Sequence, residues 1–101
     1  MLSIKPVCEN CGCNLPNESK DAMICSFECT FCKDCVDNIL KDVCPNCGGG
    51  FEKRPHRPVT CKTEYCISNY PASEKPYIKP VSSDTFKELQ DYFIKISPEL
   101  R

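Results

Sequence analysis

The chain lacks four features that particular functional classes require. It contains no run of about 18 apolar residues and no signal-peptide core near its start, so we expect neither a membrane span nor secretion. Its formal net charge is only −1, and no global basic field indicates DNA or RNA as a partner. His56 is the sole histidine and stands between prolines, so no convincing Ser-His-Asp catalytic set can be assembled.

Large apolar side chains are also too scarce in the first half for a self-sufficient core. With 101 residues, the chain is expected to form one small domain with a tail. It holds eleven cysteines, far above ordinary usage. We expect a cytoplasmic protein, where an odd number of cysteines split into close pairs favours metal ligation over disulfides. Metal would then supply much of the folding free energy.

Eight of the cysteines form four close pairs. Zinc binds four thiolates at about 2.3 Å, and the two cysteines of a C-x2-C turn, here called a knuckle, can both point at one ion. "CPNCGG" suits such a turn, because Pro45 fixes one dihedral angle while Gly48 and Gly49 let the backbone turn sharply. Eight ligands predict two zinc ions per chain. The four pairs are Cys8 with Cys11, Cys25 with Cys29, Cys32 with Cys35, and Cys44 with Cys47.

The order of these pairs resembles the RING pattern, in which the first and third pairs hold one ion and the second and fourth hold the other. The resemblance implies that Cys29 fills the usual histidine position. Each ion would then tie together distant segments and brace a chain that has little core. Spacing alone does not determine connectivity, so a nested site closed by residues 25–35 alone stays open. The RING-like assignment gives Cys8, Cys11, Cys32 and Cys35 to site one, and Cys25, Cys29, Cys44 and Cys47 to site two.

A closer resemblance covers residues 7–58, through "CENC", "NLP", "DAMICSFECTFCKDC", "VCPNCGG" and "RPHRP". These motifs resemble a RING-like bacterial family, domain of unknown function 1272 (DUF1272). The resemblance implies a RING-like double-zinc module over residues 6–58 in which Cys13 is not a ligand. We expect Cys13, Cys61 and Cys66 to be free thiols, although together with His56 they could complete a third, Cys3His, zinc site.

The predicted fold is a small metal-stabilised α+β domain, with a short hairpin over residues 22–31 and one short helix between Cys35 and Cys44. The helix is predicted from an apolar face of Val36, Ile39, Leu40 and Val43. Prolines at 71, 76 and 80 predict an extended linker over residues 59–82. An amphipathic helix is predicted over residues 83–97, from a capping box of Thr85 and Glu88 and an apolar stripe of Phe86, Leu89, Phe93 and Ile96.

Two segments leave more than one role open. The apolar stripe of the C-terminal helix needs a partner, which is its own domain, a second copy of the chain or a groove on another protein. The basic segment "EKRPHRP" is either a solvated connector or a contact for an acidic surface or nucleic acid.

We expect a non-enzymatic, zinc-stabilised module that binds a protein partner and no membrane, with a nucleic-acid-binding zinc module as a lesser alternative. Closed tetrathiolate sites leave no position for substrate. The C-x3-C-x2-C spacing resembles radical S-adenosylmethionine enzymes, but the chain is too short for their partial barrel. A redox dithiol is disfavoured because no thioredoxin-like strand and helix alternation surrounds any pair. The main alternative is a RING-type ubiquitin-ligase adaptor. Two residues count against it: ubiquitin-ligase RINGs usually have an aliphatic residue just before the second ligand, where this chain has Asn10. They usually have a basic residue just after the last ligand, where this chain has Gly48.

Overall fold

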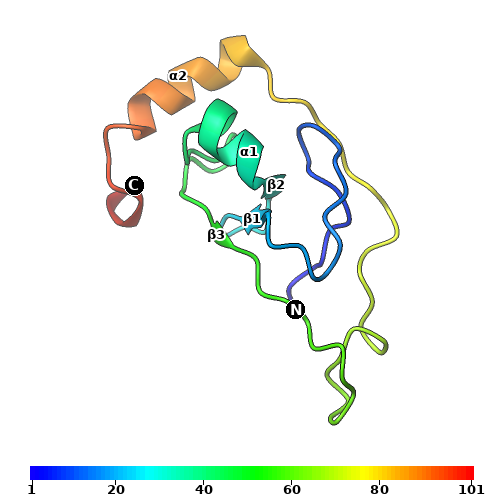
Figure 1. The fold of residues 1–101 in the computed structure, drawn as a ribbon. Coiled ribbons are helices and arrows are strands. Elements are labelled where there is room, and N and C mark those ends of the chain that lie inside the picture. The colour runs from blue at the N-terminus through cyan, green and yellow to red at the C-terminus, as the bar shows by residue number, and fades with distance from the viewer.

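The computed structural model describes residues 1–101 apart from the side chain of Ser83, and it shows an elongated molecule of 46 × 26 × 19 Å (Figure 1). None of the described helices has the length and apolar character to cross a membrane. The predicted small α+β fold is confirmed. Its elements are β1 (Ala22–Ile24), β2 (Thr30–Cys32), α1 (Lys33–Cys35), η1 (Val36–Leu40), β3 (Glu52–Lys53), α2 (Ser83–Phe93) and η2 (Pro98–Leu100).

A three-stranded antiparallel sheet in the order β2-β1-β3 forms the centre of the fold. β1 and β2 form the predicted hairpin, with Ala22 opposite Cys32. The turn between them is tight because Glu28 adopts a left-handed conformation, with φ at 66°. The hairpin therefore brings Cys25 and Cys29 to one of its ends and Cys32 to the other.

The short helix is confirmed, but it begins earlier than predicted. α1 follows β2 directly and continues into η1, a π-helical segment that ends at Leu40 and is capped by Lys41 with φ at 52°. Val36 and Leu40 are buried as expected, whereas Ile39 is 49% exposed. Its assignment to the apolar face was wrong, because the wider turn of a π-helix rotates Ile39 away from the face that Val36 and Leu40 share.

The core is small, and cysteines make up much of it. Phe31 and Phe51 meet edge to face, with ring centroids 5.5 Å apart. Around this pair pack Leu15, Val36, Leu40, Val43 and most of the paired cysteines.

The burial of Arg54 counts against a solvated connector at "EKRPHRP", which was one of the roles left open. Its side chain is only 1% exposed, and its guanidinium donates hydrogen bonds to the backbone carbonyls of Lys5, Leu15 and Pro16, at 2.8, 3.0 and 2.8 Å. The backbone N–H of Arg54 pairs with the carbonyl of Ala22, which continues the sheet and turns the side chain inward. Composition could not reveal this burial, because the partners are all backbone carbonyls.

Arg57 anchors the same segment a second time. Its backbone N–H donates to Asn17 Oδ1, and the Asn17 amide donates to the Arg57 carbonyl, both at 2.8 Å. Its guanidinium bonds to the carbonyls of Leu2 and Tyr70. The two arginines therefore clamp the N-terminal loop and part of the linker onto the sheet.

α2 docks onto its own domain, which was one of the three partners left open. Phe86 is buried, and Leu89 and Phe93 pack against the core. The amide of Gln90 donates hydrogen bonds of 2.9 Å to the carbonyls of Ile39 and Leu40, which lie at the end of η1. Figure 1 shows α2 lying across the end of the module.

The capping box predicted for this helix was wrong. α2 begins at Ser83, so Thr85 lies inside it, and the N-cap residue Ser82 makes no side-chain capping bond. The helix ends at Phe93, and Ile96 lies beyond it. Docking of the apolar stripe, rather than a cap, therefore holds the helix.

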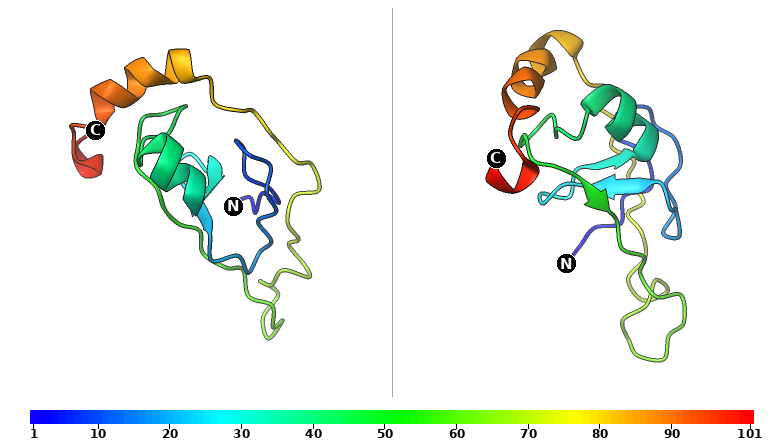
Figure 2. Two further views of the ribbon diagram at one scale, coloured as in Figure 1. Left: turned by 45° about the horizontal axis from the view of Figure 1, so that its top comes forward. Right: turned by 60° about the vertical axis from the view of Figure 1, so that its left-hand side comes forward.

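The linker over residues 59–82 holds neither helix nor strand, but it does not run free. In the left view of Figure 2 it follows the outside of the N-terminal loop to reach α2. The N–H of Ser73 donates to the Ile4 carbonyl at 2.9 Å, and that of Lys79 donates to the Glu9 carbonyl at 2.6 Å.

Cys61 and Cys66 form a disulfide, so the prediction that both are free thiols was wrong. The loop between them folds back and places their Cα atoms 5.2 Å apart. Such a turn could not be read from the five-residue separation alone. The disulfide also removes both sulfurs from the alternative third zinc site.

Candidate metal centres

The second and fourth cysteine pairs meet at one end of the hairpin. The Sγ atoms of Cys25, Cys44 and Cys47 lie within 4.8 Å of one another. Cys29 lies at the same end of the hairpin, where its carbonyl accepts the Cys25 N–H at 3.1 Å and its sulfur accepts the amide of Asn46, between Cys44 and Cys47, at 3.2 Å. The structure thus brings together all four cysteines that the sequence assigned to site two.

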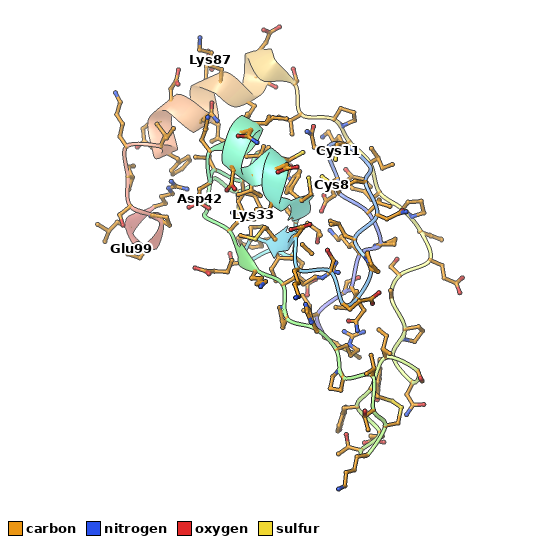
Figure 3. All side chains as sticks on the ribbon, viewed as in Figure 1. Cys8, Cys11, Lys33, Asp42, Lys87 and Glu99 are labelled. Carbon is orange, nitrogen blue, oxygen red and sulfur yellow. A yellow bond between two sulfur atoms is a disulfide. The ribbon has the colours of Figure 1, made fainter. Side chains whose placement is uncertain are left out.

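The first and third pairs meet at the start of α1. Figure 3 shows Cys8 and Cys11 beside this helix. The Sγ atoms of Cys8 and Cys35 are 3.9 Å apart, and those of Cys11 and Cys32 are 3.7 Å apart. The first pair therefore lies against the third, as in the interleaved arrangement, and the cysteines assigned to site one gather in a single cluster.

These distances fit tetrahedral zinc. Four thiolates bound at about 2.3 Å place neighbouring sulfurs about 3.8 Å apart. The two measured sulfur contacts of site one match that edge, and all the donors are soft thiols. Two thiol clusters of this kind are consistent with two zinc ions per chain, as predicted.

Cys13 joins site one although the sequence assigned it to no site. The Sγ atoms of Cys8, Cys11, Cys13 and Cys32 all lie within 4.8 Å of one another. The Cys8 N–H donates to the Cys13 carbonyl at 2.9 Å, which fixes this position. That Cys13 is not a ligand stays a prediction, but its sulfur lies beside the candidate ligands because the chain turns back at Gly12, where φ is 77°.

An asparagine in each knuckle was missed by sequence reasoning. Asn10 Nδ2 donates to Cys35 Sγ at 3.3 Å, and Asn46 Nδ2 donates to Cys29 Sγ at 3.2 Å. Each amide therefore reaches from a C-x2-C knuckle to a sulfur of the pair that shares its site. The signal was present as a repeated pattern, C-x-N-C-G, in residues 8–12 and 44–48.

The two knuckles also share their backbone geometry. Gly12 donates to the Cys8 carbonyl at 3.0 Å, and Gly48 donates to the Cys44 carbonyl at 2.8 Å. Both glycines have positive φ, at 77° and 79°. The expectation of a sharp turn at Gly48 is confirmed, whereas Gly49 does not need a left-handed conformation. The sites are two copies of one local design.

Burial disfavours charge on the thiols of the metal-free protein. Desolvation raises the pKa of Cys44 and of Cys35 above the ordinary range for a thiol. At the exposed rim, a hydrogen bond from the Cys13 backbone lowers the pKa of Cys11 to about 7. Four clustered thiolates are stable in such a place only with a cation among them, which zinc provides.

The remaining candidate ligand lies elsewhere. His56 lies in the "EKRPHRP" segment, and its Nε2 atom is 3.1 Å from the Ser19 carbonyl oxygen. It belongs to neither thiol group of the described residues.

Comparison with known proteins decides the family. A family model described as a protein of unknown function, DUF1272, matches residues 1–57, which include all eight paired cysteines. The chain belongs to the DUF1272 family. An uncharacterised protein of Rhizobium meliloti (strain 1021) is 49% identical to this DUF1272 protein over 80 residues, covering 79% of this chain and 89% of the relative. No solved structure matches the chain.

Proposed function

We propose that this DUF1272 protein is a non-enzymatic interaction module whose fold is braced by two zinc ions and whose partner is another protein. The closed donor sets support the proposal. Each site gathers at least four cysteine sulfurs, and a tetrathiolate ion has no open position for water or substrate. The zinc ions then stabilise a surface rather than perform chemistry.

A concave surface beside site two supports a protein partner. It encloses about 630 Å³ and is lined by residues of the hairpin turn, the second knuckle and the C-terminal tail, Phe27, Cys47, Phe93 and Pro98 among them. Phe27 is 75% exposed although it lies two residues from the ligand candidate Cys25. The lining combines these apolar side chains with the charged residues Asp42, Glu99 and Arg101, a mixture that is typical of protein interfaces.

Phe27 would be the anchor of this interface. The Phe27 N–H donates to Cys25 Sγ at 3.4 Å, so zinc binding and the position of this ring are linked. An exposed aromatic ring on a rigid turn loses little conformational entropy when it enters a partner's pocket.

Affinity capture from the source cells tests the proposal when three zinc-loaded proteins are compared. The wild type and Tyr77→Ala should retain one stoichiometric protein, and Phe27→Ala should lose it. Tyr77 is a matched control because it is 55% exposed and lies outside the concave surface. Recovery of nucleic acid, or equal capture by all three proteins, would contradict the proposal.

We also propose that the module acts in the cytoplasm without catalysing ubiquitin transfer. Nine cysteines carry free thiols, which fits a reducing compartment. Fractionation of the source cells followed by immunoblotting should recover the protein in the cytoplasmic fraction. A ubiquitin discharge assay should show no transfer that depends on the module.

A further inference from the structure

Site one holds one thiol more than a zinc ion can bind. Cys8, Cys11, Cys13 and Cys32 form a mutual group within 4.8 Å, and Cys35 lies 3.9 Å from Cys8. Site two gathers four cysteines. Because tetrahedral zinc accepts four sulfurs, one of the five in site one must stand aside at any time.

Cys13 and Cys35 are the two sulfurs that can alternate. The other three members of the cluster are shared by both possible quartets. Cys35 is 4% exposed, and its sulfur accepts the Asn10 amide. Cys13 is exposed and lies on the same open side as Cys11, which is also exposed. Both quartets share the exposed Cys11, and replacing Cys35 by Cys13 exchanges a buried fourth sulfur for an exposed one.

Cys13 is held in place rather than carried on a loose loop. Its carbonyl accepts the Cys8 N–H at 2.9 Å. The flanking residues Val7 and Asn14 form an antiparallel bridge with each other. Its sulfur thus stays near the cluster whichever sulfur is bound.

We propose that site one is a five-thiol site in which Cys13 replaces Cys35 as the fourth zinc ligand, and that zinc enters and leaves through the exposed pair of Cys11 and Cys13. In the exchange the zinc–sulfur bond to Cys35 breaks and one to Cys13 forms. Cys13 releases a proton to solvent, and the freed Cys35 thiolate takes one up, so charge and protons balance. This property is independent of the proposed protein partner.

Zinc stoichiometry of the full-length chain by native mass spectrometry tests the exchange. Cys13→Ser and Cys35→Ser should each keep two zinc ions, because four sulfurs remain in site one. The double variant Cys13→Ser/Cys35→Ser should keep one. Cys29→Ser is the matched control at site two, since Cys29 accepts the equivalent asparagine bond but has no spare neighbour, and it should lose one zinc ion.

The outcomes distinguish the alternatives. Loss of a zinc ion from Cys35→Ser alone, or from Cys13→Ser alone, would show that only one of the two sulfurs ligates and would overturn the proposal. Two ions in the double variant would also overturn it.

Two further measurements follow the metal at site one directly. In the cobalt-substituted protein, the sulfur-to-cobalt charge-transfer band should keep full intensity in Cys35→Ser and fall in the double variant. With wild-type protein, one of the two zinc ions should pass to a chromophoric chelator faster than the other, and Cys13→Ser should slow that phase several-fold. An unchanged fast phase would count against the entry route.

Discussion

A single asparagine in each knuckle links the two cysteine pairs of a site. Asn10 and Asn46 are polar residues on short turns, and spacing arguments that follow cysteines alone pass over them. Their amide donors nevertheless reach the sulfurs of Cys35 and Cys29. A hydrogen bond from an amide to a thiolate offsets part of its charge and fixes its direction toward the metal.

We predict that Asn46→Ala lowers the zinc affinity of site two by about 10- to 100-fold, the usual effect of losing a residue that orients a ligand. The loss should appear in competition with a chromophoric chelator. Asn38→Ala is the control, because Asn38 is an exposed asparagine on η1 outside both thiol groups. Equal affinities for the two variants would mean that the bond to Cys29 is incidental.

Arg54 is the other residue whose role depends on its surroundings. We predict that Arg54→Lys lowers the free energy of unfolding by about 3 kcal/mol, because an ammonium group cannot span three carbonyls that a planar guanidinium reaches together. Urea unfolding of the zinc-loaded proteins measures this. Lys53→Gln is the control, because Lys53 is the exposed residue next to Arg54; it should change the free energy of unfolding by less than about 0.5 kcal/mol. Similar losses in both would refute the clamp.

Among the elements, α2 depends on a glycine that belongs to a knuckle. Gly48 has φ at 79°, and a Cβ added there would lie 2.5 Å from Cε2 of Phe93. The turn that positions Cys44 and Cys47 therefore also contacts the C-terminal end of α2. This shared position joins the metal module to its tail.

We predict that Gly48→Ala lowers the free energy of unfolding by about 2 kcal/mol, through left-handed strain and displacement of the Phe93 ring. Cleavage within residues 83–101 under limited proteolysis should also become faster. Gly49→Ala is the matched control, since its added Cβ would meet Cys47 Sγ at an acceptable 3.4 Å. If Gly48→Ala leaves the tail as protected as Gly49→Ala does, the contact is not needed for docking.

For the whole molecule, metal binding and folding are expected to be one event. Structural zinc contributes about 10–16 kcal/mol per ion in small domains, while a whole domain is stable by only about 5–15 kcal/mol. The small apolar core cannot replace that contribution, because cysteines fill much of it.

We predict that removing both zinc ions with a strong chelator unfolds residues 6–58, with loss of amide dispersion in NMR spectra and of the far-ultraviolet dichroism of the hairpin and helix. Two equivalents of zinc should restore the fold, and magnesium should not, because thiolates do not suit a hard cation. A chelated protein that keeps its native spectrum would contradict this coupling.

The sequence by itself determined the family, the two clusters of paired cysteines, the hairpin, the short helix and an amphipathic C-terminal segment. These follow from local patterns, which are spacing, periodicity and turn residues. The tertiary structure alone decided that Cys13 enters site one, that Arg54 is buried, that Cys61 bonds to Cys66, and that α2 docks on its own module. In each case the residue's partner is distant in sequence, is a backbone carbonyl, or is reached through a turn. None of these relations changes the amino-acid composition or the spacing of apolar residues, so the sequence pattern does not reveal them.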